Sequence, residues 1–159
     1  MKIADIFRKF RNGKMRKTDL AVLRVSMLVA ALDGDVCEQE IKEFQSLAKE
    51  CEGYSEEEAR KAFSETLRSA GFLMLYARVE RMPEVLNAFL EEADRILPAI
   101  VDFGPDKMKN AIAVWTAMAN ADGDLSEIER QAIDCLAKTL AARNLAQTQA
   151  LDAVAVTPR

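Results

Sequence analysis

LDGDVCEQE, at residues 32–40, is repeated 89 residues later as ADGDLSEIE, at residues 121–129. A gapless alignment of residues 26–51 with residues 115–140 gives nine identities, and five of them are acidic residues or glycine within this stretch. Each copy lies between two segments whose apolar residues recur at helical spacing. The chain therefore contains a repeated unit of a helix, a DGD turn (residues 33–35 and 122–124) and a second helix.

The composition predicts a single all-α domain. The chain has 159 residues, of which 50% are hydrophobic, so it is long enough to bury a core without a cofactor. No segment alternates apolar and polar residues as a strand does, and the pattern predicts a compact bundle of about seven helices. We expect the helical domain at residues 18–154 and a loose tail at residues 155–159. No apolar run reaches the roughly 18 residues of a membrane span, so a cytoplasmic location is expected.

The residue types that are missing exclude most enzyme chemistry. The chain has no histidine, which removes histidine-based triads, zincin sites and the usual proton shuttle at neutral pH. Its six glycines stand singly, so no glycine-rich phosphate loop is present. The three cysteines, Cys37, Cys51 and Cys135, form no CxxC motif and are expected to be buried thiols. We expect a protein that is not an enzyme.

Charge is distributed unevenly along the chain. Residues 1–24 contain eight Lys or Arg and two Asp, a net +6, which leaves −10 for the rest of a chain whose total is −4. Residues 1–17 are predicted to be a basic amphipathic helix and linker, with apolar positions at Met1, Ile3, Ile6, Phe7 and Phe10. Its apolar face could close the core, or residues 1–14 could contact an anionic membrane or an acidic partner. The acidic body disfavours nucleic acid as a partner.

The expected helices follow from caps and apolar spacing. Thr18 or Asp19 is predicted to cap a helix that ends at the first DGD turn, and Ser55 to begin a capping box. After Gly71, the apolar segment 72–76 is predicted to be the buried centre of the domain. Asn144 is predicted to end a helix, with a short helix following at residues 146–154.

The DGD turns have the chemistry of a cation site. Their spacing matches the second half of a calcium-binding EF-hand loop, with Asp at loop position 5, Gly at 6 and Glu at 12. Loop positions 1 and 3 lack carboxylates, so a true EF-hand is not expected; these positions are Val29 and Ala31 in the first copy, and Met118 and Asn120 in the second. The glycines and glutamates also suit an ordinary helix-to-helix turn with a capping box.

That structural explanation does not account for the aspartates. Asp33 and Asp122 stand at the ends of helices, where the helix dipole disfavours negative charge, and Asp35 and Asp124 lie beside them. Like charges crowded in two equivalent places favour an oxygen-liganded divalent cation: Ca²⁺, Mg²⁺ or Mn²⁺.

These residues resemble the TerB family of tellurite-resistance proteins and its TerB-like relatives. The resemblance is carried by Ala121-Asp122-Gly123 with Glu129, and by Asp33, Gly34 and Glu40 after Leu32, where alanine is usual. It implies a helical bundle with two pseudo-symmetric helix–turn–helix units and makes Asp33, Glu40, Asp122 and Glu129 candidate metal ligands. Asp35 and Asp124 are added because of the charge crowding.

Two functions are therefore expected. The first is a metal-responsive interaction module in a tellurite-type stress response, which binds a protein partner or a membrane-associated complex. The second is a structural scaffold with solvated acidic turns, tethered by its basic N-terminal helix. The sequence does not decide between one shared cation site and two separate ones, nor does it indicate an oligomeric state.

Overall fold

The computed structural model describes residues 16–34, 36–96, 105–120 and 125–156. These residues form helices joined by turns and short connections, with no β-strand among them. The helices are α2 (Lys17–Leu32), α3 (Glu38–Lys49), α4 (Glu56–Val79), α5 (Met82–Asp94), α6 (Pro105–Ala119) and α7 (Glu127–Val156). The all-α prediction is confirmed, and the predicted N-terminal helix lies outside the described residues.

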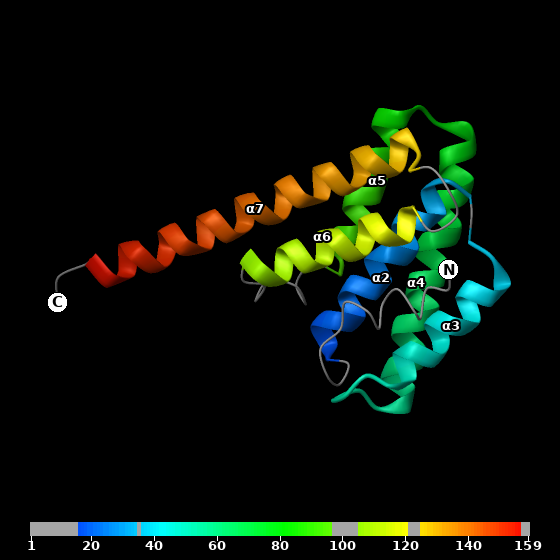
Figure 1. Cartoon of the computed structure of the whole chain (residues 1–159), viewed down its shortest axis with the longest axis horizontal. Coiled ribbons are helices and arrows are strands. Elements are labelled where there is room, and N and C mark those ends of the chain that lie inside the picture. The colour runs from blue at the N-terminus through cyan, green and yellow to red at the C-terminus, as the bar shows by residue number, and fades with distance from the viewer. Residues whose placement is uncertain (1–15, 35, 97–104, 121–124, 157–159) are drawn as a thin grey trace.

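Helix α2 is the buried centre of the bundle, and Figure 1 shows it among the other helices. Between Leu20 and Leu32 every side chain is buried except Arg24 and Ala30. This helix packs against α3, α4, α5, α6 and α7. A helix that is apolar on all sides can avoid water only when neighbours surround it, and α2 is the helix of this chain with that composition.

The repeated units are arranged in a similar way around this centre. The first helices of the two units, α2 and α6, pack against each other, while α3 packs on α4 and α7 packs on α5. Trp115 of α6 is fully buried, and its Nε1–H donates to the carbonyl oxygen of Val22 in α2 at 3.0 Å. This bond satisfies the indole N–H inside the core, where an unpaired donor would cost about 1–3 kcal/mol.

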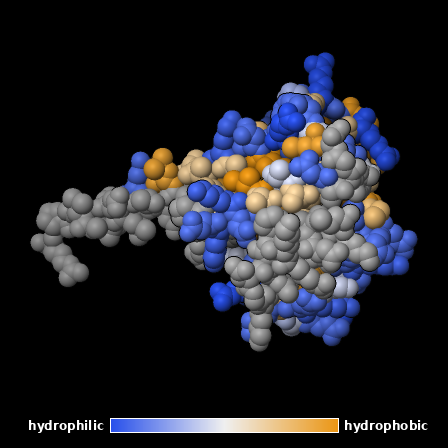
Figure 2. Space-filling model, in the orientation of Figure 1, coloured by the Kyte–Doolittle hydropathy of each residue, from blue (hydrophilic) through white to orange (hydrophobic). Residues whose placement is uncertain are grey.

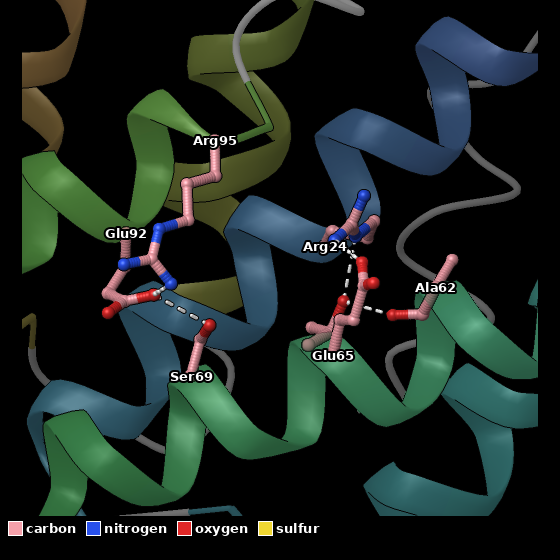
Figure 3. A network of polar contacts seen from close by, with 7 residues as sticks. Arg24, Ala62, Glu65, Ser69, Glu92 and Arg95 are labelled. Atoms are coloured by element: carbon pink, nitrogen blue, oxygen red, sulfur yellow. Dashed lines mark hydrogen bonds and ion pairs between the residues drawn. The ribbon is translucent and has the colours of Figure 1, made fainter.

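Two polar links join α4 to its neighbours (Figure 3). Arg24 of α2 donates through Nε to Oγ1 of Thr66 at 2.8 Å, and its Nη2 lies 3.7 Å from a carboxylate oxygen of Glu65. Burial lowers the pKa of the Arg24 guanidinium, although Glu65 opposes that shift. On the other side, Ser69 donates to Glu92 of α5 at 2.8 Å. These links fix the orientation of α4 between α2 and α5.

The segment predicted to be the buried centre is only partly buried. Helix α4 continues through Gly71 without a break, and within residues 72–76 only Leu73 is buried. Phe72, Leu75 and Val79 are 46%, 65% and 78% exposed. The prediction was wrong because α4 buries a different stripe, formed by small or slender residues at helical spacing: Ala59, Ala62, Thr66, Ala70 and Leu73. The segment is apolar all round, but only one side of it has a neighbour.

Two predicted helix ends also differ from the structure. Helix α2 begins at Lys17 with Arg16 as its N-cap, and Asp19 serves as the third helical residue, where its carboxylate accepts the Arg16 N–H at 2.9 Å. Helix α7 does not stop at Asn144 but runs for 30 residues to Val156, about 45 Å. A single asparagine costs a helix interior well under 1 kcal/mol, so it does not end α7.

The C-terminal part of α7 extends past the N-terminal end of α6 (Figure 1). Arg143 forms an ion pair with Asp94 at the end of α5, and Leu145 beyond it is 60% exposed. Figure 2 shows hydrophobic residues along the seam where α6 and α7 run side by side, bordered by hydrophilic side chains. None of the helices in the described part of the chain is long and apolar enough to cross a membrane.

Candidate metal-binding turns

The first DGD turn begins where α2 loses its helical hydrogen bonding. Asp33 is the C-cap of α2, and the Gly34 N–H donates to the carbonyl oxygen of Ala31 at 3.0 Å. Gly34 has φ +72°, the left-handed conformation that closes many helix ends and that glycine adopts without steric cost. The Asp33 side chain is exposed, so its carboxylate stands in solvent at the negative end of the α2 dipole.

The other end of this turn is held by Glu40, the third residue of α3. Its Oε2 accepts the backbone N–H of Cys37, the N-cap, at 3.4 Å. The Glu40 side chain is half-buried. Asp33 therefore begins the five-residue connection between α2 and α3, and Glu40 lies in the first turn of the helix that follows. Asp35, between them, lies outside the described residues.

The second turn has the same capping arrangement with shorter bonds. Glu129 is the third residue of α7, and its Oε1 accepts both the Ser126 N–H at 3.2 Å and the Ser126 hydroxyl at 2.7 Å. In return, Ser126 Oγ accepts the Glu129 N–H at 3.3 Å. The side chain of Glu129 is 4% exposed. Asp122 and Asp124 lie outside the described residues, so the structure describes three of the six predicted ligands.

The connection between α2 and α3 is not an EF-hand loop. Val29 and Ala31, at the positions of the first two ligands, are buried residues of α2 and still belong to the helix. Met118 is likewise buried in α6. An EF-hand needs twelve loop residues to wrap the ion, whereas five residues separate these two helices. Any cation here would be held by fewer protein ligands and would keep several waters.

The described residues contain no ready-made cluster of ligands. Within the described ranges, no three His, Cys, Asp or Glu side chains converge as a cation would require. A cavity of about 130 Å³ between α3 and α4 includes none of the predicted ligands; its lining consists of Gln45, Ala48, Lys49, Glu56, Ala59, Arg60 and Phe63. The ligands that are placed, Asp33, Glu40 and Glu129, belong to two turns at opposite ends of the sequence.

The cysteines differ from one another in their surroundings. All three are free thiols; Cys51 is buried, as predicted, while Cys135 is half-buried and Cys37 is exposed. Burial raises the pKa of the Cys51 thiol to about 11, with Asp19 adding to the shift and Lys17 opposing it. Cys37 was expected to be buried, but it is the N-cap residue of α3 and therefore lies at the surface.

Helix α4 carries an apolar stripe that was not predicted from the sequence, formed by the exposed Phe72, Leu75 and Val79 and the half-buried Tyr76. The Phe72 and Tyr76 rings are stacked, with centroids 5.3 Å apart. The four residues follow the i, i+3, i+4, i+7 spacing of a single helix face. The sequence does contain a signal for this stripe, because small residues form a second face of the same helix. Only one of these two faces can point into the bundle, and the small residues allow close packing there.

Comparison with known proteins agrees with this description. The model of one protein family, tellurite resistance protein TerB, matches residues 19–152, which is most of the chain and includes both DGD turns. Neither the curated proteins nor the solved structures contain a match to this sequence. The chain therefore belongs to the TerB family.

Proposed function

We propose that this protein is a non-enzymatic interaction module whose DGD turns bind divalent cations. The observation that carries the proposal is that Asp33 begins the five-residue connection between α2 and α3, while Glu40 lies in the first turn of α3 just after it. A cation that both carboxylates bind would join the end of the central helix to the first turn of α3. Carboxylate oxygens suit Ca²⁺, Mg²⁺ or Mn²⁺.

The position of Asp33 also supports a change in the angle of α3 when a cation binds. Asp33 lies at the C-terminal end of α2, where the helix dipole makes its charge unfavourable by about 0.3–1 kcal/mol. A bound cation would remove that penalty. Helix α3 buries only Phe44, Leu47 and Ala48, so few side chains hold it against the bundle. Because α3 packs mainly on α4 and has little contact with α2, a cation at the turn could change the angle between α2 and α3.

The apolar stripe on α4 supports a protein partner. Exposed apolar residues that form a contiguous patch often mark an interaction site, whereas single exposed apolar residues need no explanation. The exposed residues Arg68, Arg78 and Arg81 accompany the stripe, although residues 25–159 carry a net charge of −10. We propose that an amphipathic helix with acidic flanks binds here, and α3, which packs on α4, would transmit the state of the turn. The tellurite resistance in the family's description supports a role in that type of stress response.

A structural scaffold is the second candidate, and the second turn favours it. Glu129 is almost fully buried and already accepts two hydrogen bonds from Ser126. A capping box of this kind accounts for the glutamate without any ion. On this alternative the aspartates merely keep the turns hydrated.

Thermal unfolding with and without cations separates the two functions. A cation that binds only the folded protein stabilises it, by about 1.4 kcal/mol at a concentration of ten times Kd, so a metal-responsive module should melt later in Ca²⁺, Mg²⁺ or Mn²⁺. The increase should disappear in Asp33→Asn/Asp122→Asn. Asp106→Asn/Asp134→Asn, the same charge change at exposed positions of α6 and α7, is a matched control that should keep it. A scaffold should melt at the same temperature with and without cations.

A further inference from the structure

One edge of α3 concentrates negative charge. Glu40, Glu43 and Glu50 recur at spacings that keep them on the same side of the helix axis, and Glu52 follows just after the helix ends. We define these four residues as the acidic edge. Residues 38–58 contain eight Glu and two Lys, a net −6 in a chain whose total is −4.

The basic N-terminal segment joins the described chain beside this edge. The described residues begin at Arg16, the N-cap of α2. Lys17 lies with its Nζ 5.2 Å from the ring centroid of Tyr54, and its side chain also passes close to Gly53. The N-terminal end of α2, to which residues 1–15 are joined, therefore lies next to Gly53 and Tyr54, which come immediately after Glu52 in the sequence.

We propose that residues 1–15, the basic arm, dock along the acidic edge of α3. The arm contains five cations and one Asp, a net +4; the cations are Lys2, Arg8, Lys9, Arg11 and Lys14. Its charge complements the edge, and its attachment point lies at one end of that edge. Opposite charges already held close by the chain associate at a high effective concentration, so even a modest attraction is sufficient.

The lengths of the two partners agree. Along α3 the edge extends over the ten positions from Glu40 to the C-cap residue Glu50, about 15 Å at 1.5 Å per residue, and Glu52 follows in the turn after the helix. Residues 1–12, helical as their apolar spacing predicts and ended near Gly13, would cover a comparable length of about 17 Å. An arm that leaves near Gly53 and runs toward the start of α3 would place Lys14 near Glu50 and Glu52, with its N-terminal end near Glu40. The docking does not depend on a cation at the DGD turn.

The same charges argue against the apolar stripe of α4 as the docking site of the arm. Arg68, Arg78 and Arg81 accompany that stripe and would repel a basic segment. The stripe also lies toward the C-terminal end of α4, whereas the arm leaves beside its N-terminal end.

Paramagnetic broadening in the full chain tests this docking. A nitroxide is attached to Ala4→Cys in a chain that also carries Cys37→Ser and Cys135→Ser. Cys51 can stay, because it is buried and its pKa is raised to about 11, which keeps the thiol unreactive near neutral pH. The amide signals of residues 40–50 should broaden, and the broadening should weaken as salt is added.

Charge exchange shows whether the contact is the one proposed. Arg8→Glu/Arg11→Glu should abolish the broadening, and it changes only the arm, so the folded domain is preserved. Glu43→Arg/Glu50→Arg should abolish it as well, and combining both pairs should restore it. Glu84→Arg/Glu91→Arg, the same charge change at exposed positions of α5, should leave it intact.

Three results would overturn the proposal. One is broadening on residues 72–79 of α4 in place of α3, and another is broadening on α3 that survives all the charge variants. The third is an arm that broadens no part of the domain and becomes ordered only when vesicles of anionic phospholipid are added. That result would identify the arm as a membrane anchor.

Discussion

Gly34 and Gly71 allow one substitution to be tested in two backbone conformations. Gly34 closes the first DGD turn with φ +72°, whereas Gly71 lies within α4. A Cβ added at either position meets no atom of the described residues within 4 Å, so alanine causes no steric clash with that part of the protein at either site. Any difference between the two variants therefore comes from the backbone.

The expected effects have opposite signs. Gly34→Ala forces a residue with a Cβ into the left-handed region and should destabilise the protein by about 1–2 kcal/mol. Gly71→Ala replaces glycine inside a helix and should stabilise it by about 0.5–1 kcal/mol. In a chain of this size, 1 kcal/mol corresponds to about 2–4 °C in Tm.

Urea unfolding followed by circular dichroism measures both effects. The two midpoints should move in opposite directions from wild type while the slope m stays the same. A Gly34→Ala variant as stable as wild type would refute the reasoning, since the turn would then not require a positive φ. A change in m would instead show that the denatured state had been altered.

Three further predictions concern caps, burial and thiol chemistry. Cys37→Ser should stabilise the protein by about 0.5–1 kcal/mol in urea unfolding, because a hydroxyl caps α3 better than a thiol and Ser126 already does so in α7; no gain would mean that the cap is not formed. Leu73→Ala should cost about 2–5 kcal/mol because Leu73 is fully buried, whereas Leu75→Ala should change stability by less than about 0.5 kcal/mol; equal losses would contradict the orientation of α4. At pH 8 the thiolate fraction of Cys51 should be about 100-fold below that of an ordinary thiol, since its pKa is raised from 9.0 to about 11. A thiol reagent should therefore label Cys37 first and Cys51 only after unfolding, and because the folded state favours the neutral thiol, stability should fall as the pH rises from about 9 toward 11.

The repeat predicted the parts of the fold that depend on local sequence. The helices flanking the first DGD turn, the N-cap at Ser55 and the capping box between Ser126 and Glu129 are all present. Each depends on a few neighbouring residues that have strong preferences for a turn or a cap. Such preferences operate whatever the rest of the chain does.

Packing was predicted less well, because it depends on which neighbours are available. Residues 72–76 and the end of α2 are both strongly apolar, yet only α2 is surrounded. Helix α4 has one neighbour-facing side, and its small residues occupy that side because they allow α2 to approach closely. Asn144 likewise gave the wrong end for α7. Asparagine disfavours a helix only weakly, and the other residues of this 30-residue helix outweigh that preference.

The candidate site shows the same division. The sequence predicted that Glu40 and Glu129 would suit a capping box, and hydrogen bonds confirm that role at both turns. Cation binding could not be predicted in the same way, because it depends on whether carboxylates from separate positions in the sequence meet in space. Among the described residues they do not form a cluster of three, so metal binding stays a prediction.

The most direct test of the central proposal is an amide NMR titration of the metal-stripped protein with Ca²⁺, Mg²⁺ and Mn²⁺, repeated on Asp33→Asn/Asp122→Asn. The proposal predicts saturable shifts, or paramagnetic broadening by Mn²⁺, that centre on the amides of Gly34 and Gly123 and disappear in the variant. No saturable response up to millimolar cation, or a response that is unchanged in the variant, would contradict it and favour the structural scaffold.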